Sequence, residues 1–401
     1  MDLDLARLLA RPAETKIVLL VLDGLGGLSH PQTRRTELQT ARTPHLNRLA
    51  AQSDLGLTVP VAPGVTPGSG PGHLALFGYD PLMFEVGRGV LEAVGIDFAL
   101  VPEDVAVRGN FCTLARDDAI TDRRAGRIAT KRAQKLVERL RTIDVGPAIE
   151  VFVEPVREHR FVLVLRGPDL DARVSETDPQ RLGVAPLRSE PLHPSALATA
   201  QAINQFCDGA RRQLTDAAPA NGLLLRGIAK LPQLPQLEDV WKIQAASAAI
   251  YPMYRGLARL AGMTALGRPA SFDEQVTALR QHWDAYDYFF VHYKSTDTAG
   301  EDGDFDAKVA AIEELDRQLP VLLDLEPDVL GVAGDHATPA ILAAHSWHSV
   351  PFLLHSPYTR PDPRATFDEL SCAHGSLGTF PAAAVMPFLM AHASRLSKYG
   401  A

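Results

Sequence analysis

The sequence has little cysteine, no surplus of basic charge and no long apolar run. Its three cysteines, Cys112, Cys207 and Cys372, lie far apart and form no CxxC pair. This excludes a disulfide scaffold and a thiolate zinc site, and it is typical of a chain in the reducing cytoplasm, where we expect this one. The net charge of −8 argues against nucleic acid as a partner, because neutralising phosphates requires a surplus of basic charge.

Several other classes of protein are disfavoured. No apolar run approaches the roughly 20 residues of a membrane span, so we expect no membrane partner, and the acids among the first residues do not suit a secretion signal. The sequence contains neither a GxxxxGK[ST] loop nor a GxSxG elbow, which argues against a P-loop kinase and an α/β-hydrolase. With 401 residues, 46% of them hydrophobic, the chain is long enough for two or three globular domains.

Continuous apolar runs alternate with helical periodicity, and this predicts an α/β fold. Residues 16–22 form an unbroken apolar run, typical of a strand buried on both faces of a parallel sheet. Similar runs occupy 287–292, 329–333 and 351–355, and apolar side chains recur at helical spacing over 306–319. We therefore expect a mostly parallel sheet flanked by helices.

The middle of the chain has a different pattern, which predicts an inserted domain. Amphipathic helices are expected at 128–140 and 197–214, with a strand at 160–165 between them. We expect a smaller α/β (α+β) domain over 104–227, inserted into a discontinuous main domain of residues 1–103 and 228–401.

Acids and a histidine follow three of the expected strands. Asp23 ends the first run, Asp297 follows the second, and Asp335 and His336 follow the third. Ligands of open α/β sheets bind at the carboxyl ends of the strands, so we expect these side chains at one edge. Carboxylate and imidazole are ligands of Mn²⁺, Mg²⁺ and Zn²⁺, which favours a metal site. The alternative for any single acid is a solvated loop or a helix cap.

Residues near these motifs leave alternatives open. Glu301 follows Asp297 by four positions, either on one helical face or in a loop through Gly300. One of His345 and His348 is expected to complete a second metal shell, and the spacing does not choose between them.

Ser69 lies in the stretch 59–72, whose many glycines and prolines predict a loop. Flanking glycines let a ligand approach closely. The serine is therefore either a nucleophile activated by a metal ion or an ordinary turn residue.

A compact basic cluster, Asp122-Arg123-Arg124 with Arg127, is expected to open a helix of the insert. Arginine forks bind phosphate and carboxylate groups in a bidentate manner, so the cluster is a candidate anion site. The alternative is a solvated helix start.

Eight motifs are specific in combination: LDGLGG at 22–27, TPHLNRLA at 43–50, PGSGPGHLALFGYDP at 67–81, DRRAGR at 122–127, YRGLARLAGM at 254–263, TDTAGEDGD at 296–304, GDHATP at 334–339 and FDELSCAHGSLG at 367–378. Together they resemble the archaeal-type cofactor-independent (2,3-bisphosphoglycerate-independent) phosphoglycerate mutases of the alkaline phosphatase superfamily. The resemblance extends from about residue 16 to about residue 389, and it implies an alkaline-phosphatase-like α/β fold with an inserted domain.

The resemblance also implies two divalent metal ions, with Mn²⁺ expected first and Mg²⁺, Zn²⁺ or Co²⁺ as alternatives. One ion would be held by Asp23, Ser69, Asp335 and His336, and the other by Asp297, Glu301 and His345. Ser69 would be the phosphorylated nucleophile. The substrate would be bound by Asp122, Arg123, Arg124, Arg160 and Asp178.

The sequence departs from the family at three positions. Glu301 stands where the family has histidine, and His348 stands where an acid is common. Gln244 stands where a basic residue is common, and Lys242 or Arg255 is expected to take over its role. These departures bear on metal preference and substrate affinity more than on the fold.

The implied activity is the interconversion of 3-phosphoglycerate and 2-phosphoglycerate, small phosphorylated glycerates, through a phosphoserine at Ser69. The insert would retain the glycerate and exclude water during the transfer. Two alternatives on the same scaffold are a homoserine-kinase-like enzyme and a phosphatase. The retained Ser69 and its set of candidate ligands disfavour a non-catalytic binding protein.

Overall fold

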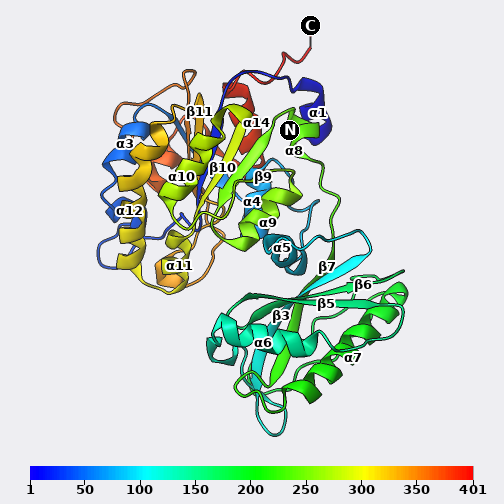
Figure 1. Cartoon of the computed structure of the whole chain (residues 1–401). Helices are drawn as coiled ribbons and strands as arrows, with labels where there is room; N and C mark the ends of the chain where they lie inside the picture. Colours follow the sequence, from blue (N-terminus) through cyan, green and yellow to red (C-terminus); the bar gives the residue numbers. More distant parts are fainter. Residues whose placement is uncertain (401) are drawn as a thin grey trace. The chain divides into compact units, whose positions relative to one another are not determined.

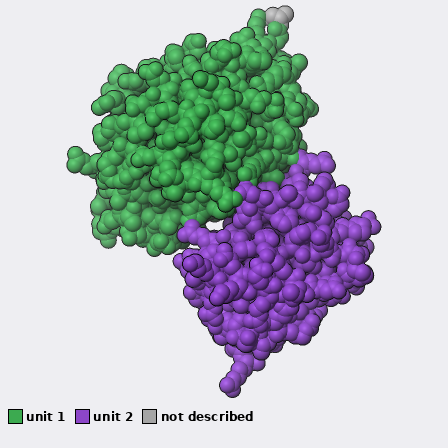
Figure 2. All heavy atoms as spheres, viewed as in Figure 1, with its two compact units in different colours: residues 1–85, 234–401 green, residues 86–233 purple. Residues whose placement is uncertain are grey.

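The computed structural model describes residues 1–400, which divide into two compact units (Figure 2). Within these residues, unit 1 comprises 1–85 and 234–400, and unit 2 comprises 86–233. The sequence placed these boundaries near 104 and 227. The difference at the first boundary arises because helix α5 (Arg88–Gly95) packs against strands β3 (Asp104–Leu114) and β7 (Gly222–Lys230) of unit 2.

Unit 1 is built on an eight-stranded sheet (Figure 1). Its strands, from one edge to the other, are β13 (Gly378–Pro381), β2 (Asp54–Val59), β12 (Val350–His355), β11 (Val329–Ala333), β1 (Ile17–Leu22), β10 (Tyr288–Tyr293), β8 (Ala245–Ala249) and β9 (Thr264–Ala265).

Strand β1 lies at the centre of this sheet and pairs in parallel with β10 and β11. All six of its residues are buried, as the unbroken apolar run predicts for a strand covered on both faces. Strand β12 departs from the parallel pattern, because it pairs antiparallel with β11 and with β2. Apolar content predicted its presence but carries no information about its direction.

Helices cover both faces of the sheet (Figure 1). On one face, Leu20 of β1 belongs to the same buried cluster as Leu46, Val276 and Leu315, which come from three different helices. On the other face, Leu19 and Leu389 both lie against Gly331. The helices of unit 1 are α1 (Leu3–Leu9), α2 (Glu37–Thr40), α3 (Pro44–Ala50), α4 (Ser69–Leu76), α8 (Leu237–Trp241), α9 (Pro252–Leu260), α10 (Phe272–Gln281), α11 (Ser295–Glu301), α12 (Phe305–Leu323), α13 (Glu369–Ala373) and α14 (Val385–His392).

The sequence predicted a loop over the whole stretch 59–72. In the structure the last part of this stretch is helical, because helix α4 begins at Ser69. Pro71 occupies the first helical turn, where a missing backbone N–H costs no hydrogen bond. The following residues, from His73 to Leu76, are buried and extend the helix into the core. Tertiary packing therefore overrides the low helix propensity of the Gly- and Pro-rich start.

Unit 2 contains a five-stranded sheet and its own apolar core. Beside β3 and β7, its elements are β4 (Ile120–Asp122), α6 (Thr130–Leu140), β5 (Glu150–Arg157), β6 (Arg160–Arg166) and α7 (Leu197–Leu214). Strand β3 pairs antiparallel with both β6 and β7. Helices α6 and α7 bury Leu136 and Phe206 with Phe161 of β6, in agreement with the predicted amphipathic helices.

No helix among the described residues is long and apolar enough to cross a membrane.

Helix α3 is capped by a side chain from another helix. Thr43 precedes it but forms no side-chain cap. Instead, the buried Asp316 carboxylate of α12 accepts hydrogen bonds from the backbone N–H groups of His45 (3.2 Å) and Leu46 (2.7 Å). These donors have no partner within their own helix.

Asp316→Ala is expected to destabilise the protein by about 1–3 kcal/mol, because it leaves two helix donors in a buried place without an acceptor. Chemical denaturation of Asp316→Ala and of the control Asp324→Ala, at the exposed residue that directly follows the same helix, measures the effect. A loss no larger than that of the control would show that Asp316 does not cap α3.

Candidate metal centre

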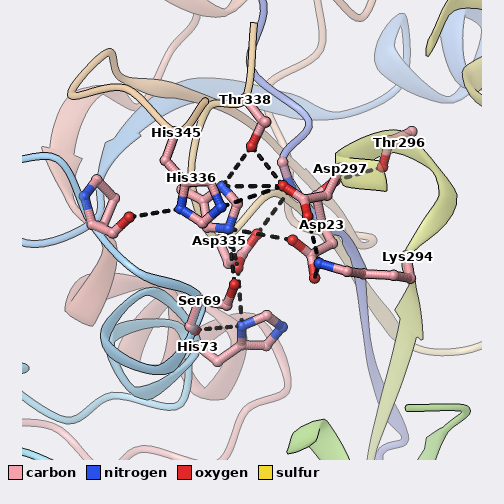
Figure 3. Close-up of polar contacts among 12 residues, drawn as sticks. Asp23, Ser69, His73, Lys294, Thr296, Asp297, Asp335, His336, Thr338 and His345 are labelled. Carbon is pink, nitrogen blue, oxygen red and sulfur yellow. Dashed lines mark hydrogen bonds and ion pairs between the residues drawn. The ribbon is translucent and has the colours of Figure 1, made fainter. Parts of the chain in front are cut away.

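Side chains from four segments of unit 1 converge at the carboxyl edge of the central strands (Figure 3). Asp23 follows β1, Asp297 lies on α11 directly after β10, and Asp335 and His336 follow β11. Ser69, the first residue of α4, places its Oγ 3.1 Å from His336 Nε2. The structure thus brings together the acids and the histidine that the sequence assigned to three strand ends.

Two groups of potential metal ligands share His336. Asp23, Asp335 and His336 form one group, and Asp297, His336 and His345 form the other; within each group one ligand atom per residue lies within 4.8 Å of the others. Asp23 Oδ1 and Asp335 Oδ2 are buried and form no hydrogen bond of good geometry, although His336 Nε2 lies 3.3 Å from the first and 3.1 Å from the second. Buried carboxylate oxygens that face an imidazole in this way suit divalent cations. The residues therefore fit the metal ions that the family resemblance implies.

Two glycines let the loops of the centre approach one another. Gly24 has a φ of +66°, and a Cβ there would lie 2.8 Å from Asp297 Oδ1. A Cβ at Gly72 of α4 would lie 2.3 Å from the backbone oxygen of Asp335. Neither position accommodates a side chain without moving a candidate ligand.

The structure also places the residues that the sequence left open. Asp297 and Glu301 lie on the same helix, α11, and Glu301 Oε1 is 3.6 Å from His345 Nε2, although the Glu301 side chain is 56% exposed. Glu301 belongs to neither ligand group. His348 stacks on Trp347 and contacts Ser346, outside both groups. Of the two histidines, only His345 reaches the centre.

Lys294, which sequence reasoning missed, lies inside the centre (Figure 3). Its Nζ donates to Asp23 Oδ2 (3.1 Å), to Asp297 Oδ2 and to the hydroxyl of Tyr254 (3.0 Å). Burial opposes its charge, but Asp23 and Asp297 raise the pKa of Lys294 well above its ordinary value. Its position directly after a buried strand and three residues before Asp297 was the signal in the sequence.

The carboxylates have unequal proton affinities. Burial raises the pKa of each, but Lys294, His292 and His336 together hold the pKa of Asp23 well below its usual range. The pKa of Asp335 is also lowered, by His336 and His73, against burial and the charge of Asp23. Burial and the neighbouring Asp23 raise the pKa of Asp297.

His336 carries the positive charge in the middle of these acids. Burial disfavours this charge, yet Asp335 and Asp23 raise the pKa of His336 to about 10. A metal ion must therefore displace a proton from His336 in order to bind it.

Three further side chains orient the candidate ligands. His292 Nε2 lies 2.9 Å from Asp23 Oδ2, and His73 Nδ1 lies 3.2 Å from Asp335 Oδ2. The hydroxyl of Thr338 donates to Asp297 Oδ1 at 2.7 Å. Groups of this kind hold ligands in register and tune their basicity.

Unit 2 contains a separate concentration of positive charge. Arg123 forms a bidentate pair with the buried Asp178, at 3.1 and 2.6 Å. The Nε of Arg160 is buried without a hydrogen-bond partner in the described part of the chain, and the Nε of Arg108 lies 3.6 Å from Glu92 Oε1. Burial and the charges of Arg160 and Arg108 lower the pKa of His159 to about 4. An anion bound here would relieve this repulsion.

Other candidate residues of unit 2 have local partners. Asp122 accepts hydrogen bonds from the backbone N–H groups of Arg124 and Gly126. The residues after Asp122 form a short 3₁₀ turn, Ala125–Arg127, and the longer helix α6 begins only at Thr130. Arg226, which the sequence did not single out, lies 3.7 Å from Asp178.

Lys242, an expected substrate ligand, is not brought to the metal centre. It precedes β8, which runs parallel to β10, so it lies at the opposite end of the strands from the acids. Its Nζ donates to the backbone oxygen of Ala10 at 2.7 Å. Gln244 also lies at that end, where its backbone N–H donates to Asp287. Arg255, by contrast, is buried on α9, which follows the carboxyl end of β8.

Comparison with known proteins shows the family of the chain. A family model described as 2,3-bisphosphoglycerate-independent phosphoglycerate mutase matches residues 50–221. A probable enzyme of that name from Deinococcus radiodurans is 49% identical over 409 residues, covering 100% of this chain and 99% of the relative. One from Thermus thermophilus is 46% identical over 397 residues, covering 98% of each chain. The chain belongs to this mutase family.

Solved structures confirm the expected fold class. The cofactor-independent phosphoglycerate mutase of Thermoplasma acidophilum matches with a TM-score of 0.70 at 32% identity, covering 94% of this chain and 100% of that one. A Pyrococcus horikoshii protein matches with a TM-score of 0.83 at 27% identity, covering 97% of this chain and 100% of that one. Membership of the mutase family, inferred from motifs, is thus confirmed along nearly the whole chain.

The choice between the two histidines can be tested by metal binding. His345→Ala is expected to weaken Mn²⁺ binding to the metal-free protein at least tenfold, because it removes a ligand from one group, whereas His348→Ala is expected to change it less than twofold. Calorimetric titration measures both affinities. Equal effects of the two substitutions would remove His345 from the centre.

Proposed function

We propose that the chain interconverts 3-phosphoglycerate and 2-phosphoglycerate in the cytoplasm through a phosphoserine at Ser69. The observation that carries the proposal is the position of Ser69 Oγ, 3.1 Å from the imidazole that both ligand groups share. A serine beside a two-metal site is suited to accept a phosphoryl group, since both its hydroxyl and the phosphoryl oxygens come under the same positive field.

The residues divide into two ligand sets. Asp23, Ser69, Asp335 and His336 would hold one divalent ion, and Asp297 and His345 would hold the other, with Glu301 beside His345 as a further ligand. When bound, the ions, Mn²⁺ first among the candidates, lower the pKa of a hydroxyl ligand and neutralise charge on phosphoryl oxygens. Glu301 places a carboxylate where the family resemblance implies an imidazole, and oxygen ligands favour Mg²⁺ and Mn²⁺ over Zn²⁺.

The chemical steps are two phosphoryl transfers. In the first, Ser69 Oγ loses its proton and forms a bond to phosphorus, while the bond from phosphorus to the C3 oxygen of the glycerate breaks and that oxygen takes up a proton. In the second, the C2 hydroxyl of the glycerate loses its proton and forms a bond to phosphorus, while the bond from phosphorus to Ser69 Oγ breaks and Oγ takes up a proton. His73 and His292 hold the carboxylates of Asp335 and Asp23 throughout.

The glycerate must stay bound between the two transfers, since otherwise water would take its place and the enzyme would be a phosphatase. The positive charge around Arg108, Arg160 and Arg226 in unit 2 supports a role in binding the glycerate carboxylate or the phosphate. The Arg123–Asp178 pair and Asp122 hold the surrounding backbone and side chains in place. Arg124 lies beside Asp122, within the same positive field.

Ser69→Ala is expected to reduce mutase activity at least a thousandfold while leaving the fold intact, because it removes only the nucleophilic oxygen. Activity is measured with Mn²⁺ and 3-phosphoglycerate in an enolase-coupled assay, with homoserine plus ATP assayed in parallel. The exposed Ser29→Ala serves as the control. Retention of more than a few percent of the activity by Ser69→Ala, or phosphate on another residue by mass spectrometry, would disprove the assignment.

Arg160→Ala is expected to lower kcat/KM at least tenfold, because a charged hydrogen bond to an anion contributes about 1.5–3 kcal/mol. Release of free phosphate relative to 2-phosphoglycerate is expected to rise, since the glycerate is held less well. Arg139→Ala, which breaks an exposed ion pair of the same unit, is the matched control. An unchanged product ratio and kcat/KM in Arg160→Ala would exclude this part of unit 2 from substrate binding.

A further inference from the structure

Lys308 is a buried lysine beside the metal centre that takes no part in the proposed chemistry. It lies on α12, and none of its surface is exposed. Its Nζ donates to the backbone oxygens of Gly24 (2.9 Å), Gly26 (3.0 Å) and Thr338 (2.8 Å). All three N–H donors of the ammonium are therefore used, and no carboxylate of the described residues lies within salt-bridge distance of it.

The three carbonyl groups belong to the two loops that carry ligands on either side of the centre. Gly24 directly follows Asp23, and its N–H donates to Asp335 Oδ1 at 3.0 Å. The N–H of Thr338 donates to the oxygens of Gly24 (3.3 Å) and Gly26 (3.1 Å), and its hydroxyl donates to Asp297 Oδ1. One ammonium thus joins the loop after β1 to the loop after β11.

The buried Glu37 and the partly buried Glu369 also hold backbone that follows these ligand loops. Glu369 Oε1 accepts the N–H of Gly27 at 3.0 Å, and Glu37 Oε1 accepts the N–H of Ala340 at 2.7 Å. Both acids, with Asp297, act on Lys308 through their charges. An uncompensated ammonium in a protein interior is costly, so carbonyl dipoles and distant acids offset its burial here. A residue that served only the core of α12 would need no charge.

We propose that Lys308 is a positioning residue of the metal centre, whose ammonium holds the loops 23–26 and 335–338 so that the ligands are preformed before metal ions bind. The proposal rests on the two-metal centre of the proposed function. It assigns Lys308 no contact with the substrate or with the metal ions.

The test replaces Lys308 with methionine, which keeps the length and apolar volume of the side chain and removes all three donors. Mn²⁺ affinity, measured by calorimetry on the metal-free protein, is expected to fall at least tenfold, as it does when groups that orient metal ligands are lost. With the metal ion limiting, kcat is expected to fall while KM for 3-phosphoglycerate changes less than twofold.

Lys16→Met is the matched control. Lys16 directly precedes β1 at the opposite end of the strand, and its Nζ also donates to backbone oxygens, those of Tyr286 (2.8 Å) and Asp284 (3.5 Å). Its loss is expected to leave Mn²⁺ affinity within twofold of the wild type. Equal losses of affinity in the two variants, or an unchanged affinity in Lys308→Met, would overturn the proposal.

A second measurement does not depend on activity. Hydrogen exchange at the amides of Gly24 and Thr338 in the metal-free protein is expected to accelerate at least tenfold in Lys308→Met, because their loops lose the shared cation. Lys308→Gln, which keeps two donors, is expected to lie between wild type and Lys308→Met and replaces it if that variant does not fold. Unchanged exchange in the variant used would overturn the proposal.

If the wild type binds Mn²⁺ but lacks mutase activity, the proposed function fails, whereas these affinities and exchange rates still decide the role of Lys308.

Discussion

Repulsion among buried carboxylates is the constraint on which this site depends. Asp23, Asp297 and Asp335 lie together, almost without solvent exposure, at one edge of the unit 1 sheet. Like charges this close, in an interior that screens them poorly, destabilise the fold unless cations offset them. In the metal-free chain Lys294 and His336 provide the positive charge. Divalent ions would replace part of this positive charge. The carboxylates whose repulsion destabilises the fold therefore also give the site its affinity for metal ions.

The architecture of unit 1 brings these charges together and keeps them in place. Parallel strands end at a common edge, so residues that directly follow β1, β10 and β11 meet there although they are far apart in the sequence. The close approach of the connecting loops requires glycine at position 24 and at position 72. Unit 2 carries the opposite charge, in arginines whose mutual repulsion favours an anion. In the function proposed above, phosphoryl transfer is assigned to the ligand side chains of unit 1 and the binding of glycerate to the guanidinium groups of unit 2.

Much of the fold could be predicted from local patterns. Strands β1 and β11 follow from unbroken apolar runs, since only a strand covered on both faces has no polar side. Helix α7 follows from its amphipathic spacing. The direction of β12 and the first turn of α4 could not be predicted, because strand pairing and the packing of a Gly- and Pro-rich turn depend on residues distant in sequence. For the same reason Lys242 was grouped with substrate ligands although it lies at the far end of its strand.

The sequence by itself determined the class of fold, the family and the set of acids at the strand ends, because these depend on short motifs and on periodicity. Only the tertiary structure decided which side chains meet. It brought His345, which the family resemblance had implied and the spacing had left open, to the centre, and it introduced Lys294 between Asp23 and Asp297. It also joined the ligand loops through Lys308. The physical reason is that a side chain's neighbours in a parallel sheet come from strands and loops that are separated along the chain, and sequence spacing does not record which of them meet in space.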